Sequence, residues 1–139
     1  MTNMAAKKTD PKAKTIGYWV STALIALMLL PGGVLQVTRQ PQNVEGFAQL
    51  GYPVYFMVLL GVWKLLGGVA LLVPRLPRVK EWAYAGAFID FSAASVSCAA
   101  TGGSAGHVIA PIVCIGILFA SWALRPESRR LGDLFPANA

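Results

Sequence analysis

Apolar residues gather in four long stretches of this chain, and each stretch is long enough to cross a membrane as a helix. A spanning helix needs roughly 20 mostly apolar residues, because it rises about 1.5 Å per residue. The stretches cover residues 16–35, 54–73, 82–100 and 107–124. Proline and glycine between them are typical of turns outside the membrane. We therefore predict an all-α, integral membrane four-helix bundle over residues 16–125, with tails over residues 1–15 and 126–139.

The third stretch is the least apolar, since it is rich in Ala and Ser and carries Asp90. Without it the chain would have three spans, and its two ends would lie on opposite sides of the membrane. The distribution of Lys and Arg argues against that alternative. The segments outside the spans hold four, one, three, zero and three of these residues in chain order. Basic residues collect on the cytoplasmic side, so we predict four spans with both ends and the loop around Arg75 to Lys80 in the cytoplasm.

The connection between the first two spans, residues 41–53, is too polar to cross the membrane. Val44, Phe47 and Leu50 recur in it at helical spacing. A short helix lying in the outer interface would place these three residues on one apolar face. An ordered loop is the alternative, and the sequence leaves both open.

Composition supports the membrane interpretation. Apolar residues make up 55% of the chain and charged residues 13%, which is about half the charged share of a soluble domain. A net charge of +6 would suggest nucleic acid as the partner of a soluble protein. Here the basic residues stand at the ends of the spans, so we expect the lipid bilayer and no nucleic acid. The first span lacks an A-x-A-like cleavage site and is expected to be retained.

Lys64 and Asp90 are ionisable residues placed well inside the spans. An unpaired charge at the bilayer centre costs roughly 3 kcal/mol. Both residues stand thirteen positions from Pro77, about which the second and third spans form a hairpin. We therefore predict that they meet as an intramembrane ion pair. The pair either fixes the register of the two helices or forms the polar centre of a substrate, quinone or proton site.

The other candidate residues are secondary. Ser92 and Ser95 could donate hydrogen bonds near Asp90. Cys98 and Cys114 differ by about 9 Å in expected depth, which exceeds the reach of a disulfide, so buried packing residues are favoured over reactive thiols.

His107 is expected to begin the fourth span as an interfacial or capping residue, with proton or metal chemistry as the alternative. The sequence contains no His/Cys cluster with metal-ligand spacing, and such clusters are what haem and transition metals need. No bound metal or haem is therefore expected.

Several motifs occur in order between residues 46 and 86, within a similarity that extends from about residue 15 to residue 126. They are Gly46-Phe47-Ala48-Gln49-Leu50-Gly51-Tyr52-Pro53, Lys64-Leu65-Leu66-Gly67, Pro74-Arg75-Leu76-Pro77 and Lys80-Glu81-Trp82-Ala83-Tyr84-Ala85-Gly86. Together they resemble the DoxX-like family of small bacterial membrane proteins. The resemblance implies a four-helix bundle in the bacterial inner membrane. The family is named after a subunit of a thiosulfate:quinone oxidoreductase system, and some relatives are linked to membrane redox and thiol stress.

The resemblance implies a role for one residue of this chain, and at a second position the chain departs from the family. Lys64 matches the family's Lys-Leu-Leu-Gly element and is expected inside the bundle. Ser97-Cys98 stands where relatives often have Ser-His, so a proton or quinone role for that His is not carried over.

Three functions follow as hypotheses. The leading one is an accessory or small subunit of a quinone- or thiol-linked redox system, not an enzyme on its own, with quinone as the implied cofactor. It would shape a quinone pocket or anchor an oxidoreductase partner through its basic face. The alternatives are a small transporter or channel for a solute or protons, and a structural bundle that assembles with itself or with a larger complex.

Overall fold

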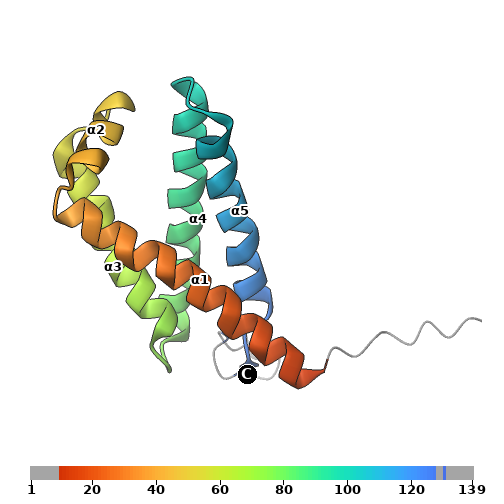
Figure 1. The fold of residues 1–139 in the computed structure, drawn as a ribbon. Helices are drawn as coiled ribbons and strands as arrows, with labels where there is room; N and C mark the ends of the chain where they lie inside the picture. Colours follow the sequence, from red (N-terminus) through yellow and green to blue (C-terminus); the bar gives the residue numbers. More distant parts are fainter. Residues whose placement is uncertain (1–9, 128–129, 131–139) are drawn as a thin grey trace, which may run out of the picture.

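The structure is a computed structural model that describes residues 10–127 and 130, and this part of the chain forms five helices (Figure 1). They are α1 (Pro11–Val37), α2 (Pro41–Gln49), α3 (Val54–Leu72), α4 (Pro77–Ala100) and α5 (Ala105–Ala123). All except α2 are long and apolar enough to cross a membrane. The predicted four-helix membrane bundle is confirmed. Most of the two predicted tails lies outside the described residues.

The first helix is longer than its apolar stretch, and the connection after it is a helix rather than a loop. α1 begins at Pro11, where the Asp10 side chain caps the helix by accepting a hydrogen bond of 3.0 Å from the Lys12 backbone N–H. Proline suits this first position because it lacks the N–H that would go unpaired there. At its other end α1 runs to Val37 and so includes Gln36. α2 also begins at a proline, Pro41.

Close packing of α1 against α3 depends on glycine at the crossing point. A Cβ atom added to Gly33 would lie 2.8 Å from the carbonyl oxygen of Gly61, and one added to Gly61 would lie 2.9 Å from that of Gly33. One added to Gly68 would lie 2.7 Å from the Leu30 side chain. Small residues at such positions let helix backbones approach in a membrane, so α1 and α3 form one tight pair.

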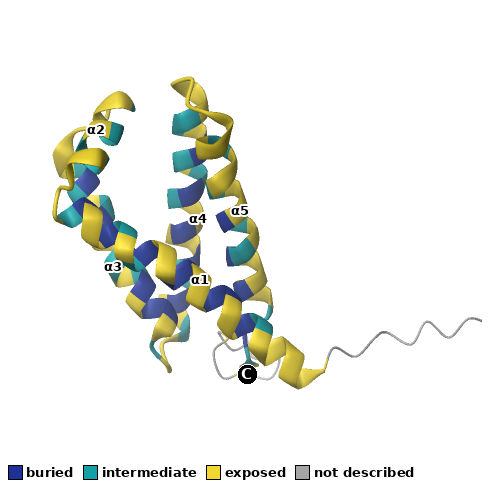
Figure 2. Cartoon of the chain, viewed as in Figure 1, coloured by how far each residue is buried: buried dark blue, intermediate teal, exposed yellow. Residues whose placement is uncertain are grey.

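Helices α4 and α5 form the second pair, and the two pairs diverge toward α2 (Figure 1). They share a buried core near the opposite end, seen as dark blue ribbon in Figure 2. The core residues are Ile25, Leu29, Leu71, Tyr84, Ala87, Phe91, Cys114 and Leu118. We call this end the basic end, because it carries Lys12, Lys14, Arg75, Arg78, Lys80, Arg125 and Arg130.

Polar contacts tie the helices together at the basic end. The Ser121 hydroxyl of α5 lies 2.6 Å from that of Thr22 on α1 and 2.7 Å from that of Tyr84 on α4. Arg125, just after α5, forms an ion pair with Glu81 of α4 and lies 5.1 Å from the centroid of the Tyr84 ring. Tyr84 therefore lies in the core, not in the interfacial belt that aromatic residues usually form.

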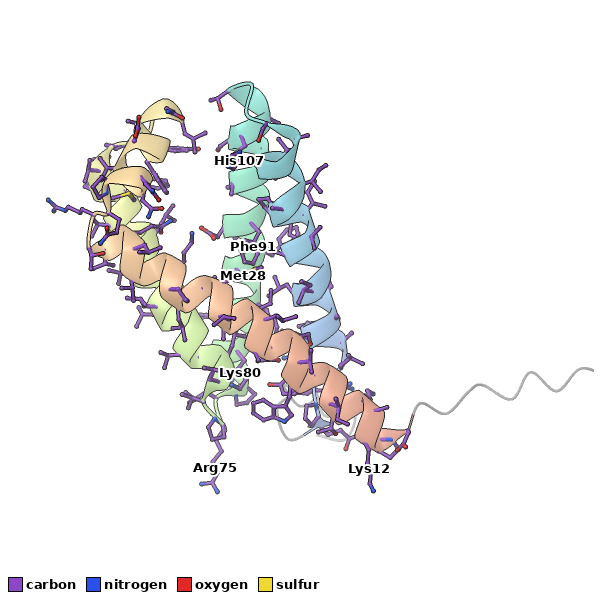
Figure 3. All side chains as sticks on the ribbon, in the orientation of Figure 1. Lys12, Met28, Arg75, Lys80, Phe91 and His107 are labelled. Carbon is purple, nitrogen blue, oxygen red and sulfur yellow. The ribbon has the colours of Figure 1, made fainter. Side chains whose placement is uncertain are left out.

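Lys80 closes the turn between α3 and α4 and is 1% exposed. Its ammonium donates hydrogen bonds of 2.6 Å and 3.0 Å to the carbonyls of Ala70 and Leu71, and another to that of Val73. The last carbonyls of a helix have no partner within it, and a cation there is also favoured by the helix dipole. Lys80 thus caps α3 and fixes α4 beside it (Figure 3).

Replacing Lys80 with methionine is expected to destabilise the protein by about 3 kcal/mol, since each buried carbonyl left without a donor costs about 1–3 kcal/mol. The exposed Arg78, in the same turn of α4, provides the control: R78M should leave stability nearly unchanged. Thermal unfolding of both variants in detergent measures the difference. Equal unfolding temperatures would show that Lys80 acts only as a surface charge.

Candidate functional site

A cavity of about 500 Å³ lies between the two helix pairs, lined mainly by α3 and α4. This volume falls within the range of about 300–1,000 Å³ that small-molecule sites occupy. Its wall is apolar except for a few side chains. The α3 wall includes Leu60, Trp63 and Gly67, and the α4 wall includes Ala83, Gly86 and Ala94. Small residues on α4 leave the space that larger side chains would fill.

The cavity is open at the surface of the bundle. Several of its lining residues are strongly exposed: Trp63 is 62% exposed, Trp82 is 81% and Ile89 is 64%. These residues lie on helices that are long and apolar enough to cross a membrane.

The structure brings Lys64 of α3 and Asp90 of α4 together on the wall of this cavity. Lys64 Nζ lies 3.4 Å from Asp90 Oδ2, and the two side chains are 19% and 14% exposed. Lys64 stands roughly 12 Å before the end of α3 at Leu72, at 1.5 Å per residue. The pair is thus deep in the bundle, where each charge compensates the other and both reach the cavity.

Gln36 of α1 supplies another polar group to the cavity. The residue is 6% exposed, and its Oε1 is buried with no hydrogen-bond partner among the described residues. The Cβ of Gln36 packs directly over Gly61 of α3, where an added Cβ would meet it at 2.9 Å. Gly61 precedes Lys64 by one turn, or roughly 4.5 Å along the helix axis. The Cβ of Gln36 and the backbone of Lys64 therefore lie about one helical turn apart along the axis of α3.

Aromatic residues close the α2 end of the cavity. The ring of Tyr52 lies 6.2 Å from that of Phe47 and 5.1 Å from that of Phe56, measured between centroids. The Tyr52 hydroxyl lies 2.9 Å from the hydroxyl of Ser97 on α4. This contact joins the two helix pairs where they are otherwise apart, so it bounds the cavity at this end.

The two serines expected near Asp90 bond elsewhere. Ser92 Oγ donates to the carbonyl of Ile89 at 3.0 Å, and Ser95 Oγ donates to that of Val108 on α5 at 2.8 Å. A serine hydroxyl in a helix often bonds a nearby carbonyl in this way. Both donors are therefore engaged away from the Asp90 carboxylate.

The remaining candidates lie outside the cavity. Cys114 is part of the core, with its Sγ 3.1 Å from Met28 Sδ, and Cys98 is a half-buried free thiol near the end of α4. His107 lies in the first turn of α5, at the opposite end from Lys12 (Figure 3), and its Nδ1 lies 2.7 Å from Ser104 Oγ. These contacts pack the core and close the first turn of α5.

Gln36 was missed from the sequence because the first apolar stretch was ended one residue before it, at residue 35. A helix prediction extended through Gln36 would have found a polar side chain within the span. In the described part of the chain, no three His, Cys, Asp or Glu residues gather as metal ligands. The polar side chains on the cavity wall thus include the Lys64 ammonium, the Asp90 carboxylate, the Gln36 amide and the hydroxyls of Tyr52 and Ser97.

Comparisons with known proteins give one match over most of the chain. The sequence model of the DoxX-like family matches residues 20–121. The protein named uncharacterized protein YdgD, from Bacillus subtilis (strain 168), is 32% identical over 47 residues. That match covers 34% of this chain and 41% of YdgD. No solved structure matches the chain.

Proposed function

The chain belongs to the DoxX-like family, and from that premise we propose that it is an inner-membrane accessory subunit of a redox system that binds the ring of a membrane quinone between α3 and α4. The observation that supports this proposal is the apolar cavity of about 500 Å³ with the Lys64–Asp90 pair on its wall. The protein has no catalytic role of its own in this proposal; it holds the quinone for an oxidoreductase partner.

The fit of a quinone to the cavity rests on its shape and its polar atoms. A quinone has a flat apolar ring, two carbonyl acceptors and a long hydrocarbon tail. The opening between α3 and α4 leaves room for the tail in lipid, while Trp63 and Trp82 provide aromatic surface beside the ring. The ammonium of Lys64 has three donors, so it can bond a quinone carbonyl and keep Asp90 as its counter-ion. A bound quinone would supply electron transfer to the complex.

The basic end is the proposed docking side for the partner. Basic residues on exposed loops collect on the cytoplasmic side of bacterial membranes. Of the described cations outside the spans, only Arg39 lies at the α2 end, whereas Arg75 and Arg78 are exposed at the basic end. An oxidoreductase with an acidic surface would be attracted there.

Filling the cavity should weaken quinone binding without unfolding the protein. Gly86 lies one turn before Asp90 on α4, and a Cβ added to it would meet nothing within 4 Å in the described structure. We expect G86L in lipid nanodiscs to bind decylubiquinone at least tenfold more weakly than the unsubstituted protein, because the leucine occupies the ring's space. Binding is measured by quenching of tryptophan fluorescence.

The matched control is G116L on α5. Gly116 is exposed and also has nothing within 4 Å of an added Cβ, but it is not part of the cavity wall. This variant should bind decylubiquinone normally. Equal affinity of G86L and G116L, or no saturable binding by the unsubstituted protein, would refute the quinone proposal.

A further inference from the structure

Hydroxyl and amide side chains on the cavity wall lie on only one side of the ion pair. Tyr52, Ser97 and Gln36 stand between the pair and the α2 end. Toward the basic end, the described wall residues carry no charge, hydroxyl or amide, and the indole N–H of Trp82 is their one polar side-chain group. These residues include Leu66, Gly67, Ala70, Ala83, Gly86 and Ala87. The ion pair therefore separates a polar half of the cavity from an apolar half.

The polar half has the length and the polar groups to hold a short column of water. Ser97 follows Asp90 by seven residues on α4, which is roughly 10 Å along the helix axis. Hydrogen-bonded oxygen atoms lie about 2.8 Å apart, so about three or four water molecules span this distance. An enclosed water needs several polar partners, which the ion pair supplies at one end of the column and the hydroxyls of Tyr52 and Ser97 at the other. The apolar half lacks such a set of partners, so water is disfavoured there.

Few contacts close the α2 end of the cavity. Among the described residues, Tyr52 and Ser97 share the one hydrogen bond that joins the two helix pairs at this end, with their hydroxyls 2.9 Å apart. Tyr52 is 37% exposed, and α2, which precedes it, has no buried residue. At the basic end, by contrast, the helices meet in the buried core. The bundle therefore opens most readily at the α2 end, where one hydrogen bond has to break.

We infer that water enters the cavity from the α2 end, through a gate formed by the Tyr52–Ser97 contact, and reaches the Lys64–Asp90 pair. The apolar half stays free of water and is left for the ring. The water column gives the pair a route for protons to the side of the membrane on which α2 lies. The use of this route rests on the proposed function: a ring reduced at the pair by two electrons from the partner takes two protons from the α2 side, one for each carbonyl oxygen. The route itself does not depend on a bound quinone.

The test measures how fast single cysteines on the cavity wall react with a membrane-impermeant thiol reagent, a methanethiosulfonate that carries a quaternary ammonium group. Ala94 and Gly86 stand four residues after and four residues before Asp90 on α4, and both belong to the wall. A94C and G86C are made in a C98A/C114A background, which removes the two native thiols. Gly86 is exposed and Ala94 is half-buried, so exposure alone would favour the reaction of G86C.

Bacterial spheroplasts and inside-out vesicles present the two sides of the membrane to the reagent. The exposed positions Q42C on α2 and R78C at the basic end show which side is which. We expect A94C to react roughly tenfold faster from the side that modifies Q42C than from the other side. G86C should react roughly tenfold more slowly than this from either side, because the charged reagent does not enter an apolar space.

The gate is tested by adding S97A to the A94C protein. Loss of the hydroxyl removes the hydrogen bond to Tyr52, so A94C should react roughly threefold faster from the α2 side. The matched control is S92A, because Ser92 lies on the same helix, donates to the carbonyl of Ile89 and is not part of the cavity wall. S92A should leave the rate unchanged. Equal rates with S97A and S92A would show that the Tyr52–Ser97 contact is not a gate.

Three results would overturn the water route. They are equal rates for A94C and G86C from the α2 side, faster modification of A94C from the basic end, and no modification of A94C from either side although it reacts fully once the protein is unfolded in SDS. Quinone binding is measured separately and is not needed for any of these reactions. Failure of the route and failure of the proposed function are therefore distinguished.

Discussion

Replacing Gly33 with valine is expected to prevent α1 from packing against α3, with a loss of about 3 kcal/mol in the free energy of unfolding. The side chain would enter space now held by the Gly61 carbonyl, only 2.8 Å from the position of its Cβ. A backbone carbonyl in a helix cannot move away by changing rotamer as a side chain can, so the two helices must separate. G61V should have the same effect from the opposite helix, where the Gly33 carbonyl is 2.9 Å away.

The neighbouring residue, Gly32, gives a matched control. It belongs to the same turn of α1, but a Cβ added to it would meet nothing within 4 Å in the described structure. G32V carries the same change in helix propensity, so thermal unfolding of the variants in detergent isolates the contact with α3. Similar unfolding temperatures for G33V and G32V would contradict the crossing described above.

The Lys64–Asp90 pair should show the second large effect. K64M leaves the Asp90 carboxylate without its counter-ion inside the bundle, and D90N does the same to the Lys64 ammonium. Breaking a buried ion pair in this way costs about 3–5 kcal/mol. The double variant K64M/D90N carries no charge at either position, so it should regain most of the lost stability. Chemical or thermal unfolding of the four proteins measures this coupling.

The double variant also separates the two roles that were open for the pair. If the pair only sets the register of α3 and α4, K64M/D90N will be stable and will bind decylubiquinone as before. If the pair is the polar centre of the cavity, as we propose, the double variant will be stable but at least tenfold weaker in binding. Failure of the double variant to recover stability would show that neither role describes the pair fully.

The spans and the approach of Lys64 to Asp90 were predicted from the sequence because simple physical rules govern them. The length of an apolar stretch follows from bilayer thickness, and two opposite charges inside spans reduce each other's cost. Their spacing about Pro77 was enough to place them at one depth. The structure has them 3.4 Å apart.

The cavity and the place of Gln36 on its wall could not be predicted in this way. The cavity exists because α1 and α3 pair tightly at Gly33 and Gly61 while α4 pairs with α5, and an apolar pattern does not say which helices pair. Lys80 was counted as a loop charge, although its ammonium folds back under α3. Side-chain direction at helix ends depends on such tertiary contacts, which one sequence does not reveal.

We propose that the cavity between α3 and α4 holds a quinone ring, and a photoreactive azidoquinone tests this claim most directly. The protein in nanodiscs is illuminated with this probe, and the labelled peptides are mapped by mass spectrometry. We predict labels within residues 60–70 and 83–97, which are lost with excess decylubiquinone and in G86L. Labels spread evenly over all the helices, or unchanged by excess decylubiquinone, would contradict the claim.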